Sequence, residues 1–264
     1  MRKTAFFIII TLIAFSCEKE SQLIIENSDM PLISQVIVDG DLVCEYSYNE
    51  ANLVIEEKHK YHFTRHFYNN SNQLLKSDYY VDPDIFSSIM PAMNREEWVN
   101  PGNTEKSLST TFDYDRNGHL IRKTYERPSV SHSEFAEYTW ENNRISRKTM
   151  YWKNELSGYI DYEYDNKGNL VREEKYIFGQ DGIPTLWAST VYEFDNMNNP
   201  YYAFKKLMSP GKLTNRYNIL RETYTLHTEL DTGDDNISVI EYSYEYNRLR
   251  YPVKVNGNIA YIYK

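Results

Sequence analysis

Three histidines within one short stretch are the first candidates for chemistry. His59, His62 and His66 lie in the run from Lys58 to His66. On a helix they would share one face and could ligate zinc. The surrounding residues alternate in polarity as in a strand, where His59 and His62 would point to opposite sides and His62 would lie about 13 Å from His66. We therefore predict no metal site here.

Acidic residues are the second candidates. The pairs Glu96-Glu97 and Glu173-Glu174 are adjacent in sequence, so in a strand their side chains diverge. A glycosidase needs two carboxylates that converge across a cleft. A calcium loop is matched in composition, but not in ligand spacing, by Asp231, Asp234 and Asp235.

Sequence motifs of common enzyme classes are absent. The chain contains no Gly-x-Ser-x-Gly elbow, no phosphate-binding loop and no dinucleotide fingerprint. We therefore expect no enzymatic activity and no cofactor. The formal net charge of −9 also argues against a partner with a phosphate backbone, so we expect no nucleic acid.

The two cysteines have different settings. Arg2 and Lys3 precede an apolar run from Ala5 to Phe15, which is typical of a secretory signal and too short to span a bilayer. We predict a lipoprotein signal peptide at residues 1–16 and lipidation, including palmitate, at Cys17. Residues 17–30 would form a tether. Cys44 shares the apolar side of a strand-like alternation, so we expect a buried and inert thiol.

One pattern recurs along most of the remaining chain, and its clearest copy lies in residues 160–176. Tyr162 and Tyr164 alternate with Asp161 and Glu163, as in a strand with one wet face. Asp165 can accept backbone N–H bonds, and Gly168 can adopt the positive φ that closes a short loop. Leu170 then opens a returning strand. The unit is a β-hairpin, and we call Tyr-x-Tyr-Asp-x-x-Gly-x-Leu the repeat frame.

Further copies of the repeat frame begin at residues 46, 66, 112, 138, 192 and 244. The turn positions are expected to be structural rather than catalytic, and they include Asp115, Gly118, Asp165, Gly168 and Asp195. The aromatic positions are expected to form the core, and they are Phe112, Tyr114, Tyr138, Trp140, Tyr162, Tyr164, Tyr192, Phe194, Tyr244 and Tyr246. Asn49, Asn69 and Asn247 replace the aspartate, and the copies at 192 and 244 lack the glycine.

This frame resembles the tyrosine-aspartate (YD) repeats of the RHS family, and more closely the small Bacteroidota-type lipoproteins built from such hairpins. The resemblance covers residues 42–264. It implies an architecture of repeated hairpins and a place in the cell envelope, but no particular activity. The large RHS proteins enclose a toxin, and this chain is too short for that.

The hairpins predict one all-β domain at residues 31–264, an antiparallel meander of roughly fourteen strands. It would form a curved sheet or a barrel-like shell, with an inward set of His62, Thr64, His66 and Tyr68. The frame lapses at 81–107, where Pro91–Trp98 could form a short helix in a lid or plug. An integral membrane barrel is disfavoured because the strand at 172–175 carries charges on both faces.

We expect a lipid-anchored protein of the outer membrane, facing the periplasm or the cell surface, that acts as a non-catalytic binding or assembly module. Its partner beyond the membrane would be a glycan, a peptide or another envelope protein. Two alternatives remain. One is a hydrolase with its site near 81–107, where the groups to suspect are Asp82, Asp84, Glu96 and Glu97. The other is a structural scaffold.

Overall fold

The computed structural model describes residues 30–83, 98–179, 181–205, 207, 209–227 and 236–264. Residues 31–264 form one compact unit. Several predictions from the sequence lie outside the described residues: the signal peptide, Cys17, nearly all of the tether, the short helix at 91–97, and the side chains of Asp84, Glu96, Glu97, Asp231, Asp234 and Asp235.

The predicted all-β class is confirmed, with seventeen strands among the described residues in one antiparallel sheet. The first nine are β1 (Ile33–Val38), β2 (Asp41–Tyr48), β3 (Val54–His59), β4 (His62–Tyr68), β5 (Leu74–Val81), β6 (Glu105–Tyr114), β7 (Leu120–Glu126), β8 (Glu134–Glu141) and β9 (Arg144–Trp152). The others are β10 (Glu155–Tyr164), β11 (Leu170–Phe178), β12 (Pro184–Asn198), β13 (Tyr217–Leu226), β14 (Asn236–Glu241), β15 (Tyr244–Tyr246), β16 (Pro252–Val255) and β17 (Ile259–Tyr263). Helical structure in the described part is limited to the 3-10 turns η1 (Pro101–Asn103), η2 (Pro200–Phe204) and η3 (Lys212–Thr214).

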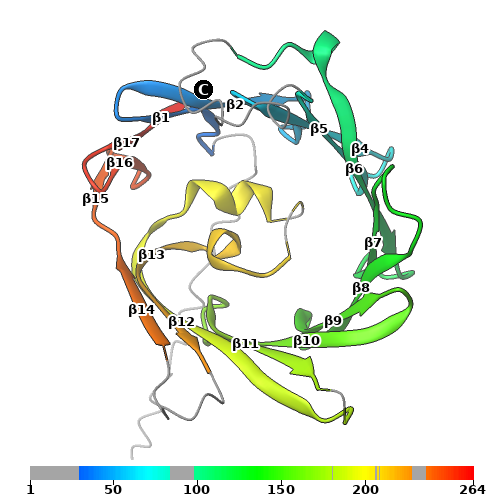
Figure 1. Ribbon diagram of the computed structural model, residues 1–264. Helices are drawn as coiled ribbons and strands as arrows, with labels where there is room; N and C mark the ends of the chain where they lie inside the picture. Colours follow the sequence, from blue (N-terminus) through cyan, green and yellow to red (C-terminus); the bar gives the residue numbers. More distant parts are fainter. Residues whose placement is uncertain (1–29, 84–97, 180, 206, 208, 228–235) are drawn as a thin grey trace, which may run out of the picture. The chain divides into compact units, whose positions relative to one another are not determined.

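Each strand from β1 to β13 pairs with the next one along the chain. β15, β16 and β17 form a second run, and β17 pairs with β1. No ladder joins β14 to β15 in the described part of the chain, so the sheet is open at that point. Figure 1 shows the strands following one another around a curve. Of the two predicted arrangements, the curved open sheet is therefore the one found.

The repeat frame has a constant local geometry. In every one of its seven copies the register shifts at the second aromatic position, for example between Glu163 and Tyr164 and between Asp113 and Tyr114. A shift of this kind marks a β-bulge, which bends the strand and re-aims a side chain. The two aromatic positions of one copy therefore differ in their surroundings, although they are only two residues apart.

The first aromatic position supplies the core. Phe112, Tyr138, Tyr162 and Tyr192 are all buried, in one cluster with Leu74, Leu120, Ile145, Leu170 and Ile219. The second aromatics of these copies, Tyr114, Trp140, Tyr164 and Phe194, pack against that cluster and are only partly buried. Tyr162 and Tyr164 therefore lie on the same side of the sheet.

The described residues of 199–216, which leave out 206 and 208, lie within the curve of the sheet, and we call them the inner segment (Figure 1). Phe204 is almost fully buried, and its ring lies 4.9 Å from the ring of Tyr46 in β2. Tyr201 contacts Tyr261 in β17, while the Ser209 hydroxyl bonds the Tyr138 hydroxyl in β8 at 2.8 Å. The inner segment thus contacts strands far apart around the sheet.

The structure corrects the predicted directions of the histidines. A turn at Lys60-Tyr61 separates β3 from β4, so the rings of His59 and His62 lie on the same side and stack at 4.2 Å. Counting the alternation of side chains across this turn was the error. Among the predicted inward set, His66 is buried and Tyr68 is half-buried, but Phe63, whose position in the alternation is opposite, is also only 2% exposed.

The prediction that Asp195 lies in a hairpin turn is also wrong. β12 continues through Asp195 to Asn198 and is followed by the inner segment instead of a returning strand. The Asp195 carboxylate accepts hydrogen bonds from the backbone N–H groups of Met197 and Asn218. The copy at 192 therefore keeps its aromatic positions and loses its turn.

Candidate functional site

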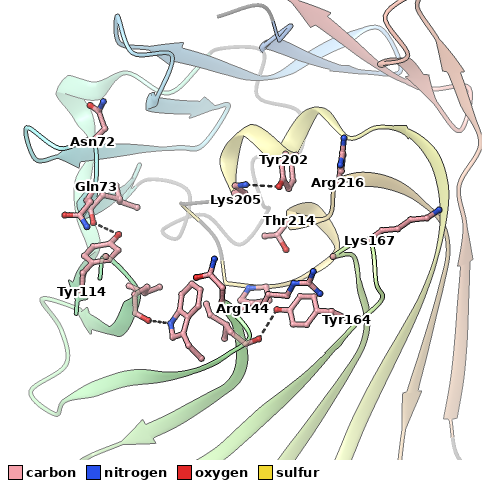
Figure 2. Close-up of a pocket in the computed structure, with 18 residues that line it drawn as sticks. Asn72, Gln73, Tyr114, Arg144, Tyr164, Lys167, Tyr202, Lys205, Thr214 and Arg216 are labelled. Carbon is pink, nitrogen blue, oxygen red and sulfur yellow. Dashed lines mark hydrogen bonds between the residues drawn. The ribbon is translucent and has the colours of Figure 1, made fainter. Parts of the chain in front are cut away.

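A pocket of about 540 Å³ lies between the inner segment and the turns of four consecutive hairpins (Figure 2). Its size is within the range typical of small-molecule sites. The sheet side is built from equivalent frame positions of the four hairpins, namely Asn72, Gly118, Asn143 and Gly168, followed by Leu74, Leu120 and Ile145. The repeat therefore brings residues about 24 to 46 positions apart in sequence to the same end of the sheet.

The turns of the sheet side are held by side-chain caps. Asp165 accepts hydrogen bonds from the backbone N–H groups of Lys167 and Asn169, at 2.9 and 2.8 Å. Asp115 accepts the equivalent pair from Asn117 and His119. Burial acts to raise the pKa of Asp165, but the hydrogen bonds from Asn169, Lys167 and Gly168 outweigh it and hold that pKa below its usual value. These aspartates are therefore occupied in the turns.

Asparagine forms the same turn where it replaces aspartate. The side-chain oxygens of Asn49, Asn69 and Asn247 each accept from the N–H groups two and four residues later. The frame glycine position has positive φ in each of these turns, with Asn52 at 57°, Asn72 at 59° and Arg250 at 65°. Substitutions in the frame thus change the residue and keep the backbone path.

The second aromatics join one hairpin to the preceding one. Tyr164 donates from its hydroxyl to the backbone oxygen of Ile145 at 2.9 Å, and Tyr114 donates to Leu74 at 2.9 Å. Trp140 donates through its indole N–H to Leu120 at 2.8 Å. All three aromatics line the pocket. Their rings are fixed in place because both the bulge and this hydrogen bond orient them.

Four cationic side chains line the pocket. Lys167 comes from a hairpin turn and Arg144 is the first residue of β9, whereas Lys205 and Arg216 come from the inner segment. Figure 2 shows Arg144 beside Tyr164 on the sheet side and Lys205 beside Tyr202 across the pocket. The eighteen lining residues include no aspartate or glutamate, and none of the four cations pairs with a carboxylate of the described residues. The pocket is therefore a cationic site on an acidic protein.

The inner segment is fixed by polar contacts as well as by Phe204. Leu170 donates its backbone N–H to the Asn215 side chain at 2.6 Å. The side chain of Asn199 donates to the backbone oxygen of Asn215 at 2.8 Å. On the opposite side, Lys123 donates to the Ser209 hydroxyl at 3.4 Å. The inner segment is thus attached to the sheet at two places, at Leu170 in β11 and at Lys123 in β7.

Two carboxylates converge elsewhere in the interior. Glu173 accepts a hydrogen bond from the Tyr192 hydroxyl at 2.7 Å, and Tyr192 lies opposite Glu222 in the next strand. Burial raises the pKa of Glu173, and the nearby charge of Glu222 adds to that effect. Lys212 of the inner segment forms an ion pair with Glu222 at 3.3 Å. Glu173 and Glu222 therefore lie beside the inner segment, but neither glutamate lines the pocket.

The histidines and Cys44 form a separate cluster near the start of the sheet. Cys44 lies 3.5 Å from the Nε2 atom of His59, and burial raises the pKa of the Cys44 thiol to about 12. Burial, together with neighbouring His59, lowers the pKa of His62 to about 4. His66 bonds Ser77 and Glu57. Within the described ranges, no group of three or more such side chains has an arrangement that could hold a metal ion.

The predicted site residues are divided between core and pocket. Asp115 and Asp165 form turns with Gly118 and Gly168, and these two glycines also line the pocket. The Tyr244 hydroxyl donates to the backbone oxygen of Ile219 at 2.7 Å. The sequence interpretation missed Arg144, Lys167, Lys205 and Arg216. The first two could have been found from the frame, since Lys167 lies in a hairpin turn and Arg144 directly follows one at the same end of the sheet. Asp82, named in the hydrolase alternative, is buried and does not line the pocket.

Comparison with known proteins gives weak structural likeness only. No protein-family model matches the chain, and no curated protein matches it. A porin-like protein from Bacteroides uniformis ATCC 8492 is 12% identical with a TM-score of 0.41, and 88% of this chain covers 98% of that one. One from Bacteroides vulgatus ATCC 8482 is 13% identical with a TM-score of 0.40, over 88% and 99%.

A TcdB2-TccC3 structure is 11% identical to the chain with a TM-score of 0.31. The match covers 84% of this chain and only 10% of that one. These scores are too low to support an argument about function. In the described part of the chain, no helix has the length and hydrophobicity needed to cross a membrane.

Proposed function

We propose that this protein is a lipid-anchored envelope protein of the YD-repeat type, and that it acts as a non-catalytic binding module. The signal-like start of the sequence supports the anchor at Cys17. The repeat frame, with a bulged second aromatic in all seven copies and a capped turn in five of them, supports the family. The ligand binds in the pocket between the hairpin turns and the inner segment.

The pocket is the observation that carries the binding role. It combines rigid aromatic side chains with amide, hydroxyl and cationic groups, which is the composition expected of a ligand site. Asn72, Gln73 and Asn143 supply amides, and Thr214 supplies a hydroxyl. A purely structural scaffold has no use for such a collection of polar groups around one opening.

A ligand screen on the full chain in detergent tests the binding role. Saccharides, peptides and small metabolites of the envelope would be added separately, and the melting temperature Tm would be measured for wild type and for Tyr202→Ala. Tyr202 lines the pocket from the inner segment, and its hydroxyl accepts a hydrogen bond from Lys205 of the same segment. We expect at least one ligand class to raise the Tm of wild type but not of the variant. Equal shifts in both proteins would place binding outside the pocket.

A labelling experiment tests the anchor. Cells grown with an alkyne analogue of palmitate should label the wild-type protein and leave Cys17→Ala unlabelled. The other cysteine, Cys44, is buried, so Cys44→Ala is the matched control and should label normally. Label in Cys17→Ala would refute lipidation at this position.

A further inference from the structure

The pocket has an unusual charge for this protein. Its four cations stand on a chain with a formal net charge of −9, and no acidic residue shares the lining with them. A cluster of like charges costs electrostatic free energy unless an anion compensates it. Neutral-ligand sites need no such cluster. The arrangement therefore points to a negatively charged group on the ligand.

Among the described residues, few hydrogen bonds occupy the donors of Arg144 and Lys205. Arg144 uses Nη1 to bond the backbone oxygen of Asp165 at 3.1 Å and packs its guanidinium over Tyr164. Lys205 bonds the Tyr202 hydroxyl at 2.8 Å and lies over the same ring. Arginine has five N–H donors and lysine has three, so most of them remain available. A planar guanidinium fits a carboxylate or sulfate through two parallel hydrogen bonds.

The glycine at position 168 leaves space for the guanidinium group of Arg144. A Cβ atom at position 168 would lie only 3.1 Å from Nη2 of Arg144. Gly168 therefore serves two ends: it closes the hairpin turn with a φ of 91°, and it lets Arg144 reach the pocket.

The uncharged lining fits a ring that carries hydroxyl groups. Trp140, Tyr114 and Tyr164 offer ring surfaces, while Gln73 and Asn143 offer amides that can both donate and accept. Both kinds of group come from the repeated hairpins. A ligand with apolar faces and polar edges matches such a wall.

The net charge of the whole protein limits the length of the ligand. A long polyanion would experience the repulsion of the net negative charge of the chain. A short ligand, or the end of a chain, with one or two acidic groups experiences mainly the four cations. From these observations we propose that the pocket binds an acidic sugar, a short saccharide or saccharide terminus that carries a carboxylate or a sulfate. This inference rests on the binding role proposed above.

Four matched probes test the charge requirement. They are digalacturonic acid, its neutral bis(methyl ester), lactose 6′-sulfate and lactose, titrated calorimetrically into the full chain in detergent. We expect at least one acidic sugar to bind, and its neutral counterpart to bind at least tenfold more weakly. The two acidic probes distinguish carboxylate from sulfate recognition. Failure of both acidic sugars to bind would overturn the inference.

Variants locate the effect in the pocket. Arg144→Gln combined with Lys205→Gln should weaken the acidic sugar at least tenfold and leave the neutral one unchanged. The matched control is Lys153→Gln with Arg248→Gln, which removes two exposed charges outside the pocket and should leave affinity unchanged. Circular dichroism melts would confirm that both double variants are folded.

The outcomes separate this inference from the binding role. If the neutral sugar binds as tightly as the acidic one, and Tyr202→Ala weakens both, the pocket binds sugars but the charge requirement is wrong. If the acidic sugar binds equally well to the Arg144-Lys205 double variant and to Tyr202→Ala, both the inference and the pocket assignment fail.

Discussion

The Tyr164 hydroxyl donates a 2.9 Å hydrogen bond to the backbone oxygen of Ile145, which lies in the preceding hairpin. The same contact recurs from Tyr48 to Ile33, from Tyr68 to Val54 and from Tyr114 to Leu74. Each begins at a β-bulge, which turns the aromatic toward its neighbour. The second tyrosine of the frame therefore links hairpins, and in doing so forms one side of the pocket.

Tyr164→Phe should lower the free energy of unfolding by about 1 kcal/mol, because it removes one hydrogen bond and keeps the ring. The loss would rise to about 3 kcal/mol if the Ile145 oxygen found no other donor. Urea unfolding followed by fluorescence measures the change.

The matched control is Tyr159→Phe in the same strand. The Tyr159 ring stacks on Tyr176 at 4.7 Å, and no hydrogen bond of its hydroxyl is seen among the described residues. We expect almost no loss there. Equal losses at the two positions would show that the hydroxyl of Tyr164 has no special role.

Asp165→Ala should destabilise the fold by about 1–2 kcal/mol, since it removes the acceptor of two backbone N–H groups. Asp165→Asn should cost much less, because asparagine already forms this turn at positions 49, 69 and 247. Chemical unfolding of the two variants at neutral pH measures the difference. Similar losses in both variants would mean that the charge, and not the acceptor geometry, matters.

The pH dependence of Asp165 has a defined sign. Its folded-state pKa lies below the unfolded value, so its contribution to stability is complete above the unfolded pKa of about 3.9. That contribution is lost as the pH falls through the folded-state pKa. Asp165→Asn should therefore lose less stability than wild type when the pH is lowered from 5 to 3, with Tm as the measure.

Lys123→Met should make the protein more stable near neutral pH. Lys123 is 5% exposed, and burial together with the neighbouring Lys148 lowers its pKa to about 7. Between that value and the unfolded pKa of about 10.4, the unfolded state binds more protons, so stability rises with pH by up to about 1.4 kcal/mol per pH unit. The methionine variant should lack this rise between pH 7 and 9. If the stability of the variant rose with pH as steeply as that of wild type, the result would contradict the lowered pKa of Lys123.

The hairpins could be predicted from the sequence because their signals are local. An aromatic pair, an aspartate or asparagine and a residue able to adopt positive φ are all found within nine positions, and Asp115 and Asp165 lie in the turns as expected. His59 and His62 show the limit of this reasoning. A two-residue turn between them reverses the chain, and alternation counted across it gives the wrong side.

The inner segment could not be predicted in this way. Its sequence, with Pro200, Pro210 and Gly211, is typical of a surface loop. It packs inside the curve of the sheet because Phe204 meets Tyr46 and Tyr48, which lie 156 to 158 residues earlier in the chain. The pocket follows from that long-range packing, so Lys205 and Arg216 could not be assigned to it in advance.

A structure of the full chain bound to the acidic sugar identified by titration tests the central claim most directly. The account predicts that the sugar lies between the hairpin turns and the inner segment, with its acidic group about 3 Å from the side-chain nitrogens of Arg144 or Lys205. A sugar bound on the outer face of the sheet, or an acidic group directed away from all four cations, would contradict it.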